Sequence, residues 1–165
     1  MKIYQLKAKQ ILPISVEEAW EFISNPENLK TITPDAMGFN ILTVKEEKMY
    51  AGQIICYKVT PLLGIKTSWV TEITQVKEGE YFVDEQRFGP YSMWHHKHFI
   101  TPVPGGVLME DIVDYKIPMG ILGQFAHAVV VKKQLKEIFL YRNTKLEELF
   151  GTVKEQKPEL IFKSF

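Results

Sequence analysis

The chain has 165 residues, of which 45% are hydrophobic, 24% charged and 12% aromatic. A chain of this length can bury a core without metal or disulfide staples. Its composition excludes a disordered or low-complexity protein. We expect one domain over residues 1–151, followed by a charged tail over residues 152–165.

The charges balance, with 20 basic and 20 acidic residues. A balanced chain has no general attraction to nucleic acid or to an anionic membrane. Cys56 is the only cysteine, which excludes an internal disulfide and suits a reducing compartment. No segment reaches the roughly 18 apolar residues of a membrane span. We therefore expect a cytoplasmic protein with no nucleic-acid partner and no stable membrane insertion.

The N-terminal segment predicts a strand and two short helices. Residues 2–12 are compatible with a strand, which Pro13 ends because proline lacks a backbone N–H. Ser15-Val16-Glu17-Glu18 is a capping box and predicts a helix start. Pro26 is well placed to begin a second short helix, which Thr33-Pro34 closes.

From Gly38 to Ile117 the apolar residues recur with a period of two, which is typical of strands. Short turns separate the segments and favour an antiparallel meander. We expect strands near residues 38–46, 52–60, 65–76, 80–88, 92–103 and 106–117. The turn at residues 61–65 is unusually apolar, so we expect it to act as a lid or to touch a membrane transiently.

A helical period follows Pro118-Met119-Gly120 and continues to Gly151. Its predicted apolar face carries Leu122, Phe125, Ala126, Val129, Leu135, Ile138, Phe139, Leu146 and Leu149. The elements together predict an α+β fold in which a strongly curved antiparallel sheet of about seven strands wraps around this helix. Either side chains or a ligand must fill the concave side of such a sheet.

Charged residues mark the outer face of each strand, so their sequence neighbours point inward. On residues 80–88 this rule places Phe82, Asp84, Gln86 and Phe88 on the concave face. In the segment with three of the four histidines, outward Lys97 turns Trp94, His96 and His98 inward and His95 outward. The same alternation places Asp111, Val113 and Tyr115 inside.

Polar groups on a buried face need partners. The sequence leaves three interpretations open. Asp84 or Asp111 pairs with His96 or His98 in a structural network, or these groups orient the polar end of a ligand, or the imidazoles perform acid–base chemistry. The structural network is the favoured interpretation.

Arg142 lies among apolar residues of the long helix and therefore needs an anion. A salt bridge to Asp84 or Asp111 is favoured over a ligand carboxylate or phosphate. His96 and His98 are spaced acceptably for a metal, with Asp84 or Asp111 as a possible oxygen ligand. Because no further Cys or His signature accompanies them, we expect no metal and no cofactor.

Several short sequence segments extend this interpretation. They are Ala19-Trp20, Pro26-Glu27-Asn28-Leu29, Thr33-Pro34, Met37-Gly38-Phe39, Trp69-Val70-Thr71-Glu72-Ile73, Phe82-Val83-Asp84-Glu85-Gln86, Gly89-Pro90-Tyr91, Trp94-His95-His96-Lys97-His98-Phe99, Asp111-Ile112-Val113-Asp114-Tyr115, Pro118-Met119-Gly120 and Tyr141-Arg142. With the order of elements, they resemble the helix-grip superfamily of START lipid-transfer domains, polyketide aromatase/cyclases and birch-pollen allergens. The resemblance covers about residues 3–150 and is closer to a bacterial ligand-binding branch sometimes labelled cell-division-inhibitor-like or polyketide-cyclase-like.

The resemblance implies a binding or carrier protein for a small hydrophobic ligand, such as a lipid, an isoprenoid or a polyketide-like molecule, held between the sheet and the C-terminal helix. One alternative is a polyketide cyclase or dehydratase-like enzyme in which His96, His98, Asp84 and Asp111 are catalytic. A further alternative is a regulatory interaction protein without a small ligand. Binding is favoured over catalysis, and the oligomeric state stays open. The predicted ligand-binding residues are Tyr57, Trp69, Phe82, Asp84, Gln86, Trp94, His96, His98, Asp111, Val113, Tyr115, Ile138, Phe139 and Arg142.

Overall fold

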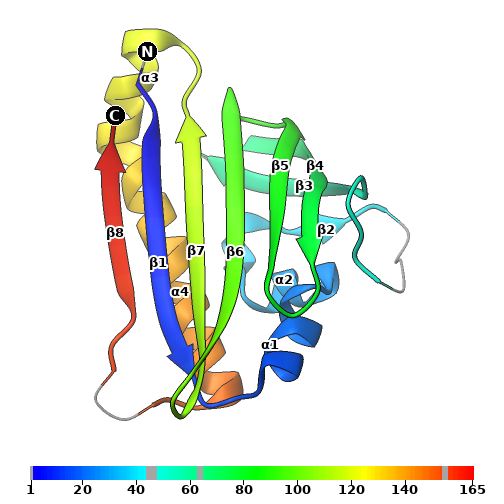
Figure 1. Ribbon diagram of the computed structural model, residues 1–165. Helices are drawn as coiled ribbons and strands as arrows, with labels where there is room; N and C mark the ends of the chain where they lie inside the picture. Colours follow the sequence, from blue (N-terminus) through cyan, green and yellow to red (C-terminus); the bar gives the residue numbers. More distant parts are fainter. Residues whose placement is uncertain (1, 44–47, 63–64, 154–155) are drawn as a thin grey trace.

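One long antiparallel sheet and one long helix face each other in the computed structural model, which describes residues 2–43, 48–62, 65–153 and 156–165 (Figure 1). In chain order the elements are β1 (Tyr4–Leu12), α1 (Val16–Ile23), α2 (Pro26–Thr31), a 3₁₀ turn (Asp35–Met37), β2 (Asn40–Ile41), β3 (Ile54–Leu62), β4 (Ile65–Lys77), β5 (Tyr81–Phe88), β6 (Met93–Val103), β7 (Gly106–Lys116), α3 (Gly120–Ala126), a π-helical segment (His127–Val131), α4 (Lys132–Phe150) and β8 (Glu159–Ser164). The predicted α+β helix-grip fold is confirmed.

The sheet has the strand order β2-β3-β4-β5-β6-β7-β1-β8, and all neighbouring strands are antiparallel. The meander from β2 to β7 follows from the short turns, whereas β1 joins it from the other end of the sequence, with Tyr4 opposite Tyr115. Figure 1 shows β8, β1, β7 and β6 running side by side, with the β3–β4 hairpin turned across them. This bend gives the sheet a concave side, which the helices cover.

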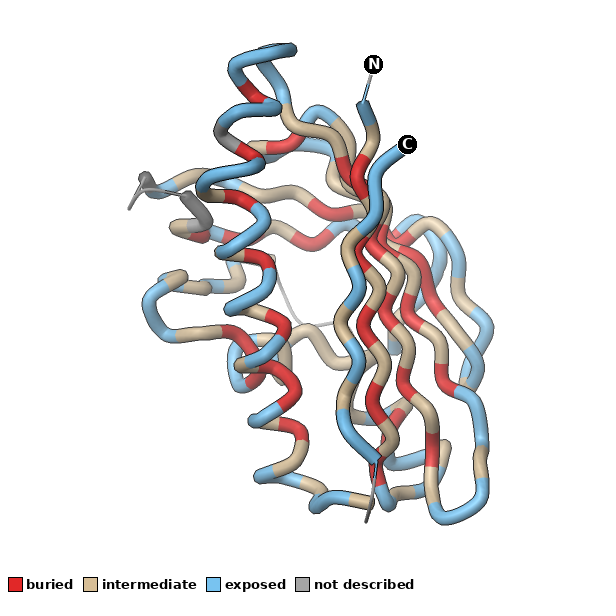
Figure 2. Tube along the Cα trace, turned by 90° about the vertical axis from the view of Figure 1, so that its left-hand side faces the viewer, coloured by how far each residue is buried: buried red, intermediate tan, exposed pale blue. Residues whose placement is uncertain are grey.

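The core lies between the concave face and the helices. Buried and half-buried residues alternate along β1 and β7, as Figure 2 shows for the sheet viewed beside α4. Because strand side chains alternate between faces, this pattern means that one face is packed and the other meets solvent. Leu6, Leu12, Val107, Val113 and Tyr115 are the largest fully buried side chains.

The start of α1 is as predicted. The Ser15 hydroxyl accepts a hydrogen bond from the Glu18 amide at 3.1 Å, and the Ser15 amide donates to the Glu18 carboxylate at 2.9 Å. This capping box gives side-chain acceptors to two backbone N–H groups, those of Ser15 and Glu18. It fixes where the chain turns from β1 into the helix. Within the described part of the chain, no helix is long and apolar enough to cross a membrane.

The predicted apolar face of the long helix is wrong at its beginning and at its end. Leu122, Phe125 and Val129 are exposed, and so is Leu149. The π-helical segment His127–Val131 adds a residue to its turn, so the apolar stripe before it does not continue into the buried stripe of α4. Figure 1 also shows α3 at the end of the molecule, beyond β7, where little sheet is left to cover it.

Two further expectations need correction, on the strand near residues 38–46 and on the turn after residue 60. The strand predicted over 38–46 is only Asn40–Ile41, and residues 44–47 lie outside the described chain. β3 extends to Leu62, so the predicted turn shortens. The side chains of residues 61–65, proposed as a lid or membrane-touching tip, lie outside the described residues. The end of the tail forms β8, which pairs with β1 from Tyr4↔Ser164 to Lys9↔Glu159.

Phe88 also departs from its predicted inward position, because it is 72% exposed. The pairing of β4 with β5 shifts register between Val70 and Thr71 and again between Ile73 and Gln75. Such irregularities rotate the strand locally, so strict alternation from Asp84 no longer predicts the orientation at the end of β5.

Candidate ligand-binding site

A cavity of about 190 Å³ lies between the concave face of the sheet, α2 and α4. Most of its lining is aliphatic or aromatic. Asp84 on β5, His96 and His98 on β6 and Arg142 on α4 are among its few polar side chains. A cavity with an apolar wall and a few convergent polar groups is the common form of a small-molecule site.

Ten of the fourteen side chains predicted to bind a ligand line this cavity. They are Tyr57, Trp69, Phe82, Asp84, Trp94, His96, His98, Ile138, Phe139 and Arg142. Their role in binding stays a prediction, because the fold alone does not test it.

The other four predicted residues do not line the cavity. Asp111 lies behind the two histidines, at 3.0 Å from His96 Nε2. Val113 and Tyr115 are fully buried in the core cluster under the helix. The side-chain amide of Gln86 holds the turn after β5 by donating to the Tyr91 carbonyl at 2.7 Å and accepting from the Tyr91 amide at 3.2 Å.

The wall formed by α2 and the following residues was missing from the predicted site. It contributes Leu29, Ile32, Thr33, Met37 and Phe39. The resemblance strings had included several of these positions, but periodicity alone gives no sign of which side of a six-residue helix faces a cavity. Tyr91, in the turn between β5 and β6, was also missed, because periodicity gives no sign of the direction of a turn side chain.

Aromatic rings close one end of the cavity. Trp69 and Trp94 meet edge to face with ring centroids 5.3 Å apart, and Tyr91 lies 4.8 Å from Trp94 and 5.7 Å from Trp69. Edge-to-face pairs are favourable geometries for aromatic rings and hold them in place. The two indoles therefore form a fixed apolar surface within the lining.

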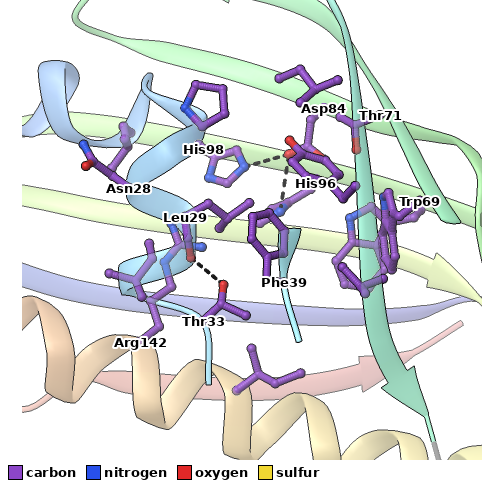
Figure 3. A pocket seen from close by; sticks show the side chains of 18 of the residues that line it. Asn28, Leu29, Thr33, Phe39, Trp69, Thr71, Asp84, His96, His98 and Arg142 are labelled. Carbon is purple, nitrogen blue, oxygen red and sulfur yellow. Dashed lines mark hydrogen bonds and ion pairs between the residues drawn. The ribbon is translucent and has the colours of Figure 1, made fainter. Parts of the chain in front are cut away.

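Two histidines and two aspartates, His96, His98, Asp84 and Asp111, form a largely buried quartet on the sheet beside these rings; Figure 3 shows Asp84, His96 and His98. His98 Nε2 lies 2.8 Å from Asp84 Oδ2 and His96 Nε2 lies 3.0 Å from Asp111 Oδ1. The other nitrogens cross over, with His96 Nδ1 at 3.5 Å from Asp84 Oδ2 and His98 Nδ1 at 2.8 Å from Asp111 Oδ1. Each imidazole thus lies between the two carboxylates.

Strand register explains why these four side chains meet. Asp84 on β5 is opposite His96 on β6, and His98 on β6 is opposite Asp111 on β7. Residues directly opposite one another on the same face of a sheet have neighbouring side chains. The spacing of two between the histidines keeps both on the concave face.

The surroundings shift the pKa of each member of the quartet. Burial alone raises the pKa of the Asp84 carboxyl, but the charge on His96 and the hydrogen bond from His98 lower it below its usual value. Burial likewise opposes ionisation of Asp111, yet Arg142 and the two histidines hold the pKa of that carboxyl well below its usual range. Both aspartates are therefore anionic at neutral pH.

The two histidines differ. Burial and the neighbouring His98 lower the pKa of His96. Burial also acts to lower the pKa of His98, but the adjacent carboxylates of Asp111 and Asp84 outweigh burial and raise it. The shifts separate two adjacent imidazoles, so that His98 is the one that carries a proton more readily.

Arg142 projects from α4 toward the quartet. Its Nη2 lies 3.5 Å from Asp111 Oδ1, which identifies Asp111 as the anion that the sequence required. Its Nε is buried without a hydrogen-bond partner among the described residues. Arg142 also lines the cavity.

Comparisons with known proteins identify the fold. No family model matches the chain, and a search of curated proteins finds no match. Among solved structures, protein CV1439 from Chromobacterium violaceum is similar with a TM-score of 0.68 and 13% identity, over 90% of this chain and 99% of that one. A START superfamily protein from Mycobacterium smegmatis is similar with a TM-score of 0.66 and 14% identity, over 88% and 99%.

The allergen Ara h 8.0201 is also similar, with a TM-score of 0.57 and 12% identity, over 88% of this chain and 99% of the allergen. The START superfamily protein and the allergen thus share the fold that the resemblance implied. At these identities the likeness shows the fold alone.

Proposed function

We propose that this protein binds a small hydrophobic molecule in the cavity between the sheet and α4. The observation that carries the proposal is the combination of an apolar cavity of about 190 Å³ with buried polar groups at one side of it. The START and Bet v 1-like neighbours support it, because theirs is generally a fold that binds small ligands.

The volume limits the size of the ligand. An apolar cavity of about 150 Å³ in another protein holds benzene. A cavity of about 190 Å³ therefore has room for a molecule of roughly one aromatic ring with a short side chain, or one short isoprenoid unit, without rearrangement. Longer lipids require the walls to move apart.

The polar side of the cavity favours a ligand with one hydrogen-bonding end. Arg142 Nε offers a buried donor, while Trp69 and Trp94 offer rings for apolar contact. A fully buried donor contributes most to binding affinity when an acceptor atom of the ligand accepts its hydrogen bond. We expect the ligand's oxygen near Arg142 and its hydrocarbon part against the indoles.

The test is a size series of alkanols from hexan-1-ol to dodecan-1-ol, with 1-naphthol and geraniol, measured by isothermal titration and thermal shift. Ligands of matching size are expected to bind saturably at one per chain. They should raise the free energy of unfolding by about 2.7 kcal/mol at 100 times Kd. An absence of saturable binding across the series would contradict the proposal.

A pair of variants on α4 locates the binding. Ile138 lines the cavity, whereas Leu140 on the same helix is 46% exposed. Ile138→Phe fills part of the cavity and is expected to weaken binding at least about tenfold. Leu140→Phe adds the same group outside it and should leave Kd unchanged. Equal effects of the two substitutions would place the ligand elsewhere.

A second candidate function is acid–base catalysis on a polyketide-like substrate. It rests on the pairing of His98 with Asp84 at 2.8 Å within the cavity lining, since carboxylate-oriented imidazoles serve as general acids and bases. His98→Gln should then abolish turnover of an aromatic polyketide precursor while retaining its binding. Unchanged turnover in this variant would argue against catalysis by that residue.

A further inference from the structure

Three metal-ligating atoms converge on the polar side of the cavity. Asp84, His96 and His98 each offer one ligand atom, and these three atoms lie within 4.8 Å of one another. We propose that these three side chains bind a divalent transition-metal ion, with Zn²⁺ as the best-fitting ion. This site goes beyond the proposed binding of a hydrophobic molecule and does not depend on it.

The distances suit a metal of this size. Zn–N and Zn–O bonds of about 2.0–2.1 Å place tetrahedral ligand atoms about 3.3 Å apart. Asp84 Oδ2 lies 2.8 Å from His98 Nε2 and 3.5 Å from His96 Nδ1, which bracket this value. Small side-chain rotations bring the three atoms to coordination distance. Two imidazoles and one carboxylate form a donor set that zinc and related ions accept.

The opposite nitrogens of both imidazoles face one carboxylate. His96 Nε2 lies 3.0 Å from Asp111 Oδ1, and His98 Nδ1 lies 2.8 Å from the same oxygen without the alignment of a hydrogen bond. A histidine that binds a metal through one nitrogen usually donates the other N–H to a carboxylate, which fixes the tautomer. Asp111 serves both imidazoles, and Arg142 holds Asp111 from behind.

The sheet holds the candidate ligands rigidly. His96 and His98 are both on β6, and Asp84 is the cross-strand neighbour of His96 on β5. All three side chains are largely buried, with side-chain exposures of 9 to 15%. Sites built on strands are more accurate in geometry than sites on loops.

The open side of the site faces the cavity. Asp84, His96 and His98 line it, whereas Asp111 does not. Three protein ligands with one free position are typical of zinc sites that bind water or substrate. A divalent ion and Arg142 against two carboxylates leave one positive charge. The free position therefore favours an anionic ligand from the cavity, such as hydroxide or a carboxylate.

The test uses the full chain after treatment with a chelator, titrated with Zn²⁺ by calorimetry and with Co²⁺ by visible absorption. The expected result is one equivalent of either ion and the intense absorption of tetrahedral cobalt. Asp84→Asn and His98→Gln should each weaken binding at least about 100-fold. Asp111→Asn, which keeps the three ligands but removes the carboxylate that faces both imidazoles and Arg142, should weaken it about 10- to 100-fold.

His95→Gln is the matched control. His95 is adjacent to His96 but points away, with Nδ1 at 2.9 Å from Glu85 Oε1 on the outer face. This variant should bind both ions as the wild type does. If it loses binding and Asp84→Asn does not, the ion occupies an adventitious surface site and the proposal is overturned.

The cobalt absorption spectrum of the wild-type protein tests the proposal even if a variant of the quartet fails to fold. Cobalt that remains octahedral and solvated, or no uptake at all, overturns the proposal. Far-UV circular dichroism with chelator present checks that each variant is folded. The alkanol titration repeated in chelator separates the two proposals, because hydrophobic binding without metal leaves the proposed function intact.

Discussion

Arg142 and Asp111 have the clearest energetic role among single residues. Both are buried, and their atoms lie 3.5 Å apart beside a second carboxylate, Asp84. Removing one partner of a buried ion pair leaves the other charge buried without compensation. The resulting loss of stability is larger than the net contribution of the pair, measured against an apolar replacement of both residues. The quartet would then hold two anions with only imidazoles to balance them.

Arg142→Met is accordingly expected to lower the free energy of unfolding by about 3–5 kcal/mol, measured by urea denaturation. Lys145→Met provides the control, because Lys145 pairs with Glu148 at 2.6 Å on the surface of the same helix. Exposed pairs contribute up to about 1 kcal/mol. Similar losses in both variants would show that Arg142 acts through helix packing and not through Asp111.

His127 makes stability depend on pH at a place remote from the cavity. Its Nε2 lies 2.8 Å from the Tyr115 hydroxyl, and its ring stacks on Tyr4 at 3.5 Å. Burial together with the positive charges of Lys132 and Lys2 lowers the pKa of His127 to about 4. The folded state therefore keeps this imidazole neutral where the unfolded chain is already protonated.

In the unfolded chain His127 has a pKa of about 6.5 and takes up a proton below that pH. The contribution of neutral His127 to stability is therefore fully present above pH 6.5 and falls as the pH drops toward 4. We expect a contribution on the order of 1–2 kcal/mol over this window. His127→Gln should flatten the pH dependence by that amount in denaturation curves taken from pH 7 to pH 4.5. A difference between wild type and variant that does not change with pH would exclude this role.

Among the elements, the long helix divides into two parts with different packing. Before the π-helical segment, Leu122 and Phe125 are 68% and 71% exposed. After it, Leu135 and Phe139 are 4% exposed and belong to the core cluster with Leu6 and Tyr115. Only the second part contributes apolar burial to folding.

Leu122→Ser and Phe125→Ser are therefore expected to change the free energy of unfolding by less than about 0.5 kcal/mol. Leu135→Ala and Phe139→Ala should each cost about 2–5 kcal/mol, because they leave cavities in a packed core. Equilibrium urea denaturation of the four variants measures the contrast. A loss above 2 kcal/mol for the serine variants would mean that α3 packs against something in solution.

At the scale of the whole molecule, the two ends of the chain complete the sheet together. β1 lies between β7 and β8, and Figure 1 shows both termini at the same end of the molecule. Leu160 and Phe162 of β8 pack against the core cluster that contains Leu6 and Phe139. Residues 159–164 thus cover the edge of β1, which would otherwise offer unpaired backbone groups.

Truncation after Gly151 removes this strand. The shortened chain is expected to lose about 2–3 kcal/mol, since two half-buried apolar side chains and one strand pairing disappear. It should also aggregate more readily through the uncovered edge of β1. Thermal unfolding and size-exclusion chromatography of residues 1–151 measure both effects, and an unchanged Tm with a monomeric profile would show that residues 1–151 are self-sufficient.

Local sequence signals were sufficient for the fold and for most of the candidate site. The capping box at Ser15, the period of two along β3 to β7 and the change of period after Gly120 each depend on neighbouring residues, so they are readable without tertiary structure. The inward direction of Asp84, His96 and His98 follows from the same alternation. Seven of the ten predicted site residues that line the cavity lie on strands and follow from this alternation, and the other three lie on α4.

Tertiary structure decided what alternation and periodicity do not contain. Register across strands brought Asp111 against both imidazoles, irregular pairing of β4 with β5 turned Phe88 outward, and the π-helical segment separated α3 from the buried stripe of α4. Pairing of β8 with β1 joined residues from opposite ends of the chain. The sequence by itself determined the direction of side chains on the regular parts of the strands, because that depends on local geometry. Only the packed structure determined which of them meet, because that depends on contacts between distant segments.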